Sequence, residues 1–109
     1  MSRLLSHADH DRLRAEFRWQ FPPRLNMADQ CLAQDPAAVA IIEHDGSPHP
    51  VSFGELEMMT DRLAHALQAD RGDRIGILRT QSAWTAAAHL AVWKSAAISV
   101  PRSNSASAR

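Results

Sequence analysis

Residues 71–101 read RGDRIGILRTQSAWTAAAHLAVWKSAAISVP, and this stretch decides the fold. It opens with an apolar run of strand length at 74–79 and closes with another at 97–101. Between them lies a helical run at 83–95, for which Ser82 is a suitable N-cap. Two strands separated by one helix predict a parallel pair joined by a crossover helix. The expected fold class is therefore α/β.

The helical run at 83–95 has no polar face. Alanine, leucine, valine and tryptophan side chains point in all directions around its axis, and Lys94 is its one certain charge. A helix that is apolar all round needs cover on most sides. A chain of 109 residues buries only a modest fraction of its surface. This helix therefore suits a larger body than 109 residues can build.

Residues 51–67, VSFGELEMMTDRLAHAL, carry the clearest local signal. Ser52 and Glu55 have the spacing of a capping box, in which each side chain satisfies a backbone N–H at the start of a helix. One face of the following helix is apolar and the opposite face is charged. Gly72 is expected to be the left-handed residue that ends the helix. The apolar face consists of Phe53, Leu56, Met59, Thr60, Leu63, Ala64 and Leu67, and only Met58 is misplaced.

The N-terminal part alternates polar segments with turn signals. Residues 7–18 predict a short surface helix or an extended arm, and the two prolines that follow interrupt any helix. Asn26 is a suitable N-cap for a helix over 27–34. The β-branched run at 38–44 predicts a strand, which a turn and residues 51–53 complete as a hairpin.

These elements divide the chain into three segments. Residues 1–24 form an arm with a proline-containing linker, and residues 25–101 form a body in which helices alternate with short, mostly parallel strands. The tail 102–109, RSNSASAR, is low in complexity. We expect this tail to be disordered, as a stretch translated out of frame would be.

Composition excludes several classes of protein. The formal net charge is zero, so no basic surface is expected to attract nucleic acid or an anionic membrane. No apolar run approaches the length of a membrane span, and the N-terminus lacks the apolar core of a secretory signal. The single Cys31 excludes an internal disulfide framework and a cysteine-based zinc site. We expect a cytoplasmic protein.

The histidines are the first candidates for metal binding or catalysis, and each has a simpler interpretation. His7 and His10 have the spacing of two ligands on one helix face, but polar residues near a terminus are the better interpretation. His44 and His49 flank the turn and are interpreted as surface residues of the hairpin rather than a ligand pair. His65 falls on the polar face of its helix. His89 lies among alanines, and we expect a hydrogen-bonded structural histidine.

Other candidate groups are also explained structurally. Cys31 is expected to be a small buried or half-buried residue rather than a nucleophile. Glu55 would be a tempting general base, yet its capping-box position explains it. The sequence RGDR at 71–74 is a turn into a strand, and the three tryptophans belong to the core or an interface. Helical pairing on a solvated face accounts for Asp9, Asp11, Glu16, Arg12, Arg14 and Arg18.

Three stretches, in this order, resemble the acyl-CoA synthetases of the AMP-binding, acyl-adenylate-forming ligase superfamily. FRWQFPPRLNMADQCL, residues 17–32, resembles their aromatic-rich entry and Pro-x-x-Asn-x-Ala-Asp helix. Residues 51–67 resemble their (T/S)-(Y/F)-x-E-L motif and the helix after it. Residues 71–101 resemble their Gly-Asp-Arg-Val strand, the next helix and the Lys-x-Gly-Ala-x-x-x-Pro strand. The entry stretch favours the short- or medium-chain branch.

The resemblance implies that the chain is the first part of the large N-terminal domain of such a ligase. The full enzyme would use ATP and Mg²⁺ to convert a carboxylic acid into an acyl-adenylate, and coenzyme A would then displace AMP to form a thioester. The sequence departs from the family at Thr80, where proline is usual, and at 95–97, where glycine is usual.

The phosphate loop, the nucleotide-binding segment, the hinge and the C-terminal lysine of this family do not occur in the 109 residues. We therefore expect a truncated fragment, inactive alone, with no catalytic, cofactor-binding or metal-binding residue of its own. Its partner would be the missing remainder of the enzyme, and the fragment alone would tend to aggregate. The alternatives are a non-catalytic module that docks on a separately encoded remainder, and a small independent α/β binding protein.

Overall fold

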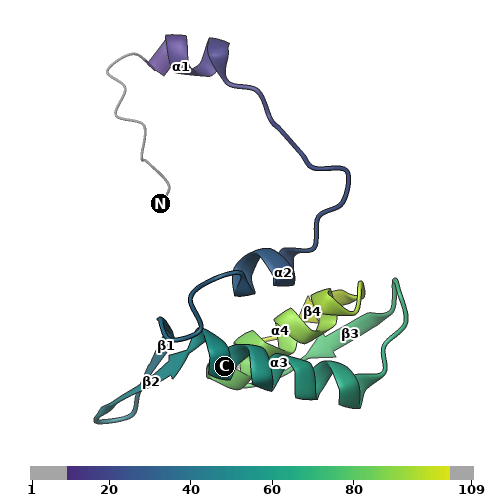
Figure 1. The fold of residues 1–109 in the computed structure, drawn as a ribbon. Helices are drawn as coiled ribbons and strands as arrows, with labels where there is room; N and C mark the ends of the chain where they lie inside the picture. The colour runs from purple at the N-terminus through teal and green to yellow at the C-terminus, as the bar shows by residue number, and fades with distance from the viewer. Residues whose placement is uncertain (1–9, 104–109) are drawn as a thin grey trace, which may run out of the picture.

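The computed structural model describes residues 10–103, and helix α4 lies beside α3 and the strands β3 and β4 (Figure 1). In chain order the elements are α1 (His10–Glu16), α2 (Met27–Leu32), β1 (Val39–His44), β2 (Pro48–Ser52), α3 (Phe53–Leu67), β3 (Arg74–Ile77), α4 (Ala83–Lys94) and β4 (Ile98–Pro101). Strands β3 and β4 pair in parallel, and β1 and β2 form an antiparallel hairpin. The expected α/β class, with a parallel pair joined by a crossover helix, is confirmed.

Helix α4 is covered on more than one side. It contacts α2, α3, β3 and β4. Ala87 and Leu90 pack with residues of α2 and α3, whereas Val92 packs with Ile77 and Ala97 beside the strands. The side chain of Trp93 contacts both clusters. The chain thus provides much of the cover that an all-apolar helix needs. The buried residues of α4 are Ala83, Ala87, Leu90, Ala91 and Val92.

Helix α3 begins as the sequence predicts. The Ser52 hydroxyl accepts a hydrogen bond from the N–H of Glu55, and the Glu55 carboxylate accepts one from the N–H of Ser52. Most of the predicted apolar face turns inward, with Leu56 and Thr60 buried, but Leu67 at its end is 40% exposed. Met58 is exposed, as its position on the wheel predicts. The buried hydroxyl of Thr60 donates to the carbonyl of Leu56.

The left-handed residue at the end of α3 is Gln68, with φ of 46°, so the assignment of this role to Gly72 was wrong. Gly72 has φ of 84° in the later turn before β3. Its N–H donates to the carbonyl of Ala96 at 2.9 Å and so connects this turn to the one between α4 and β4.

The second strand of the hairpin begins at Pro48, three residues before the expected start, so the turn is shorter than predicted. Pro48 and Pro50 lie in the segment between residues 44 and 51 that the sequence predicts as the turn, but they pair with His44 and Ile42. Proline cannot donate to a strand ladder, yet an edge strand tolerates it. Both strands of a two-stranded sheet are edge strands.

Some other boundaries also differ from expectation. Strand β3 ends at Ile77 rather than at residue 79, and α2 ends at Leu32 rather than at residue 34. Asn26 is the N-cap of α2 as predicted, since its Oδ1 accepts from the N–H groups of Ala28 and Asp29.

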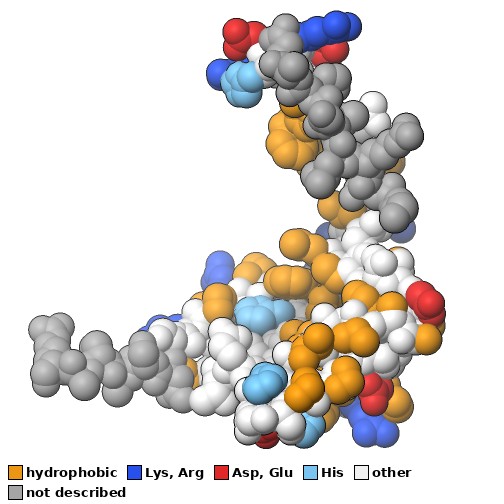
Figure 2. Space-filling view, turned by 90° about the vertical axis from the view of Figure 1, so that its left-hand side faces the viewer, with side chains coloured by type: hydrophobic (Ala, Val, Ile, Leu, Met, Phe, Trp, Pro, Cys, Tyr) orange, Lys and Arg blue, Asp and Glu red, His pale blue; other side chains and the backbone are white. Residues whose placement is uncertain are grey.

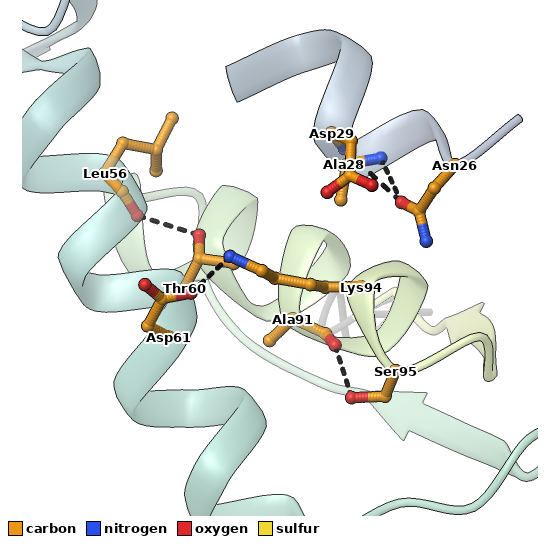
Figure 3. A network of polar contacts seen from close by, with 9 residues as sticks. All are labelled: Asn26, Ala28, Asp29, Leu56, Thr60, Asp61, Ala91, Lys94 and Ser95. Atoms are coloured by element: carbon orange, nitrogen blue, oxygen red, sulfur yellow. Dashed lines mark hydrogen bonds and ion pairs between the residues drawn. The ribbon is translucent and has the colours of Figure 1, made fainter. Parts of the chain in front are cut away.

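Side-chain contacts attach the surrounding elements to α4. The Nδ2 of Asn26 donates to the carbonyl of Trp93 at 2.9 Å and so ties α2 to α4. The ammonium of Lys94 forms an ion pair with Asp61 of α3 (Figure 3). Helix α1 buries no residue and lies at the end of an extended arm (Figure 1). Along this arm Phe17, Trp19 and Phe21 pack on one another, with ring centroids 5.0 and 5.7 Å apart.

Hydrophobic side chains remain at the surface of the body and of the arm on the face drawn in Figure 2, and charged side chains gather at α1. Within residues 10–103, no helix is both long enough and apolar enough to cross a membrane. His7, Asp9 and most of the tail, for which predictions were given above, lie outside the described residues.

Ala96 is in the left-handed region, with φ of 57°, within the segment where the resembling family has glycine. An L-residue in this region is strained by about 1 to 2 kcal/mol. Glycine removes this strain, but it loses about 0.5 to 1 kcal/mol more backbone entropy than alanine when the chain folds. We expect Ala96→Gly to raise the free energy of unfolding by about 0.5 to 1 kcal/mol, measured by urea denaturation followed by circular dichroism. The exposed helical control Ala66→Gly should lower it by about 1 kcal/mol. Equal losses for both variants would show that the left-handed strain is absent.

The ion pair between Lys94 and Asp61 generates a prediction for alkaline pH. The hydrogen bond to Asp61 raises the pKa of Lys94 above its ordinary value of 10.5, with a smaller opposing effect of burial. The stabilisation is therefore complete below pH 10.5 and is lost as the pH rises through the higher pKa of the folded state. Lys94 is the only lysine and the chain has no tyrosine, so few other groups titrate in this range.

We expect Asp61→Asn to lower the Tm at pH 8 by the equivalent of at most about 1 kcal/mol. The difference in Tm from the wild type should shrink above pH 10.5. Asp70→Asn serves as the control, because the Asp70 side chain makes no ion pair among the described residues. A difference that is constant from pH 8 to the highest pH tested would contradict the assignment.

Candidate functional site

A groove of about 650 Å³ lies between the end of β1 and the first turns of α4. It is the best candidate for a site because titratable and hydroxyl side chains meet in it. Its volume is within the range of small-molecule pockets. The polar residues that line it include Glu43, His44, Asp45, Ser82, Thr85 and His89.

The N-terminus of α4 is capped by Glu43 of β1, which accepts a hydrogen bond from the N–H of Ala83. Ser82 occupies the N-cap position as predicted, but its side chain makes no capping bond. A carboxylate at a helix N-terminus offsets the positive end of the helix dipole. This end of α4 is therefore already supplied with an anion by the chain itself.

The hydroxyl oxygen of Ser82 is buried, and no described residue forms a hydrogen bond with it. A buried polar atom without a partner costs about 1 to 3 kcal/mol. Thr85, one turn later, donates its hydroxyl to the carbonyl of Thr80 at 2.7 Å. Ser82 is therefore the hydroxyl of the groove lining that has no hydrogen bond to a described residue.

His89 is half-buried and participates in a hydrogen-bond chain. The indole N–H of Trp93 donates to the hydroxyl oxygen of Ser99 at 2.9 Å, and this oxygen lies 3.1 Å from Nδ1 of His89. A serine beside a histidine resembles a nucleophile with its base. Here, however, the indole donates to the same oxygen and makes it less nucleophilic. The hydrogen bonds agree with the prediction of a structural histidine.

The remaining histidines do not form a common site within residues 10–103. In the hairpin His44 is opposite Pro48 and His49 is opposite Glu43, so the two rings do not form a pair. The Nε2 of His49 instead lies 2.8 Å from the Asp45 carboxylate. Both His10 and His65 are exposed. Among the described residues, no group of three or more His, Cys, Asp or Glu side chains could hold a metal ion.

Cys31 is exposed, so the expectation of a buried or half-buried residue was wrong. Helix α2 turns Ala28 and Leu32, one helical turn apart, into the core. Cys31 consequently lies on the solvent side. On α1, Arg12 and Glu16 form the predicted helical ion pair at 2.9 Å.

A second groove, of about 990 Å³, lies between the start of α2 and the turns around β3 and β4. Its lining includes Arg24, Arg71 and Trp93. Both arginines are exposed, which leaves them hydrated by solvent. This groove is wider and offers no buried polar group with an unmet hydrogen bond, so it is the weaker candidate.

Comparison with known proteins connects the fold to a family. The sequence profile described as "AMP-binding enzyme" matches residues 28–109. A search among curated proteins gives no match.

Among solved structures, the crystal structure of IdnL1 aligns with a TM-score of 0.69 and 28% identity, over 80% of this chain and 19% of that one. CmiS6 aligns with a TM-score of 0.67 and 29% identity, over 83% and 24% of the two chains. Apo MatB from Rhodopseudomonas palustris, at 21% identity and a TM-score of 0.65, covers 73% and 17% and shows likeness of fold alone. The chain therefore spans about a quarter or less of the length of these three proteins.

The capping role of Glu43 is open to a direct test. We expect Glu43→Ala to lower the free energy of unfolding by about 1 to 2 kcal/mol, because the N–H of Ala83 loses its acceptor. The matched control Glu57→Ala removes an exposed carboxylate from α3 and should change stability by less than about 0.5 kcal/mol. Urea midpoints of the two variants make the comparison, and an equal effect of both would mean that Glu43 does not cap α4.

Proposed function

Because the chain belongs to the family of AMP-binding enzymes, we propose that it forms part of a ligase that activates a carboxylic acid as its acyl-adenylate. The observation that supports this most strongly is the match of the family profile over residues 28–109, which includes every element from β1 to β4. The structural similarity to IdnL1 and CmiS6 supports the same fold over four fifths of the chain.

In this proposal the chain supplies scaffold rather than chemistry. The polar side chains of the groove beside α4 are mostly engaged in structural contacts, since Glu43 caps α4 and His89 bonds to Ser99. The groups that bind ATP, Mg²⁺ and coenzyme A would come from polypeptide outside these 109 residues. We place the boundary between the arm and this scaffold at residues 24 and 25.

We further propose the acyl-CoA synthetase branch, with coenzyme A as the acceptor of the acyl group. The support is the entry stretch at 17–32 together with the contacts of Asn26. That side chain caps α2 and donates to the carbonyl of Trp93, so asparagine at this motif position has a clear structural purpose. Neither aspartate nor serine could both accept at the cap and donate an amide hydrogen to a carbonyl in this way.

The second candidate function is a docking module that completes a separately encoded remainder of the same kind of ligase. The apolar side chains that remain exposed on the body support this function. Trp84, Ile98 and Val100 are 38–48% exposed on α4 and β4, the elements that form the centre of the body. Both candidate functions require a larger body around this chain, so they share the experiment below.

Acid-dependent exchange of pyrophosphate into ATP measures acyl-adenylate formation directly. We expect the chain of 109 residues to show no exchange with any of a panel of short- and medium-chain acids. A chimaera, in which residues 28–101 replace the matched segment of a catalytically active family member, should retain exchange. Ala87→Glu in the chimaera should abolish exchange because Ala87 is fully buried, whereas Met58→Glu on the exposed face of α3 should not.

Exchange catalysed by the chain alone would contradict the scaffold role. A chimaera with a native circular dichroism spectrum but no exchange would contradict the proposed activity. Transfer of the acyl group to coenzyme A, assayed in the same chimaera as thioester formation, tests the finer assignment to the acyl-CoA synthetase branch. Adenylate formation without thioester formation would exclude that branch.

A further inference from the structure

The two strands of the parallel sheet have unequal outer edges. The N–H of Ile98 donates to the carbonyl of Asp73 at 2.7 Å, and the N–H of Arg102 donates to the carbonyl of Ile77 at 2.9 Å. In a parallel pair, alternate residues of each strand direct both backbone groups to the same side. Residues 73, 75 and 77 therefore face β4, and residues 74, 76 and 78 direct their N–H and C=O groups away from it.

The outer edge of β3 is a complete docking edge for another strand. Arg74, Gly76 and Leu78 all possess an N–H, and no other described strand pairs with this edge. On β4 the outward residues are Ser99 and Pro101, and proline has no N–H to donate. An added strand thus finds a regular series of donors and acceptors beside β3 and an interrupted one beside β4.

No contact among residues 10–103 explains the glycine at position 76, at the centre of this edge. Its φ lies outside the left-handed region, and a Cβ built on it meets no atom within 4 Å. Glycine inside a strand weakens the strand, and it often marks a place where another backbone approaches closely. A large side chain on a neighbouring strand also commonly covers an edge glycine. Gly76 therefore indicates a partner that lies outside the described residues.

The face of the sheet that includes Gly76 is also bare. Ile75 and Ile77 point towards α4, so their alternate neighbours Arg74 and Gly76 point to the opposite face. The register places Ile98 beside Arg74 and Val100 beside Gly76 on that same face, where they are 48% and 38% exposed. Parallel sheets almost always have both faces covered. The partner must therefore be apolar where it meets this face.

We propose that the outer edge of β3 accepts an extended, apolar strand from the part of the ligase that lies outside these 109 residues, with a large side chain of that strand beside Gly76. The inference rests on the proposed function for the identity of the partner. Beyond that function, the inference specifies that the sheet is extended at the edge of β3, and that Gly76 is the residue that accommodates the added strand. Backbone hydrogen bonds along the edge supply affinity, as in other cases of strand addition.

Residue-resolved hydrogen exchange, compared between the chain of 109 residues and the chimaera described above, tests the edge without reference to activity. In the chain alone, the amides of Arg74 and Gly76 should exchange rapidly, whereas those of Ile75 and Ile77, bonded to β4, should be protected. In the chimaera, the amides of Arg74, Gly76 and Leu78 should become protected. Rapid exchange of Gly76 in the folded chimaera overturns the proposal, even where the chimaera is an active ligase.

A substitution at Gly76 gives an independent readout. Gly76→Val should stabilise the chain alone, because a β-branched side chain favours a strand and the space around it is open. In the chimaera, the same substitution should lower the Tm because valine occupies the space of the partner. Arg74→Val, at the equivalent outward position one pair earlier, is the matched control and should lower the Tm of the chimaera less.

A rise in Tm for Gly76→Val in both proteins, or protection of Gly76 already in the chain alone, overturns the proposal. Failure of the chimaera to fold also counts against it, because the edge would then fit no ligase body.

Discussion

A helix without a polar face has to be enclosed, and the enclosure of α4 determines the positions of the other elements. The parallel strands cover one side through Val92, and α2 and α3 cover another through Ala87 and Leu90. Alanine-rich helix surfaces allow such close approach because the side chains are short. Among the described residues, Trp93 is the side chain that packs against both apolar clusters, so α4 joins two small cores that would each be marginal alone.

Polar contacts then fix the direction and register of each neighbour of α4. Asn26 attaches α2 at the C-terminal end of α4, and Glu43 attaches the hairpin at its N-terminal end. Lys94 attaches α3 through Asp61. Each contact joins residues far apart in sequence. Asn26 and Glu43 bond to backbone groups at the two ends of α4, where such groups lack partners within the helix, whereas Lys94 and Asp61 join two side chains. Apolar packing supplies most of the stabilisation, and these polar contacts determine which of the possible arrangements of the helices the chain adopts.

The parts of the structure that the sequence predicts are those governed by neighbours within one helical turn. The capping box of α3, the N-cap Asn26 and the inward face of α3 all depend on such spacing. The cap of α4 does not, because Glu43 lies 40 residues before Ala83 and competes successfully with the local serine. The exposure of Cys31 depends on which side of α2 meets α4. The prolines of β2 are also not predictable from local spacing. A strand can contain them only because it lies at the edge of its sheet, which the sequence alone does not show.

The contact between Asn26 and Trp93 has a consequence for the order in which the chain assembles. The two residues are 67 positions apart, so a ribosome adding about 5 to 20 residues per second makes Trp93 about 3 to 13 s after Asn26. Through that interval α2 lacks its attachment to α4, and α3, completed at Leu67, is the apolar surface available to it. The apolar side chains that pack on α4, such as Ala28, Leu32 and Leu56, therefore stay uncovered on that side until α4 has been synthesised.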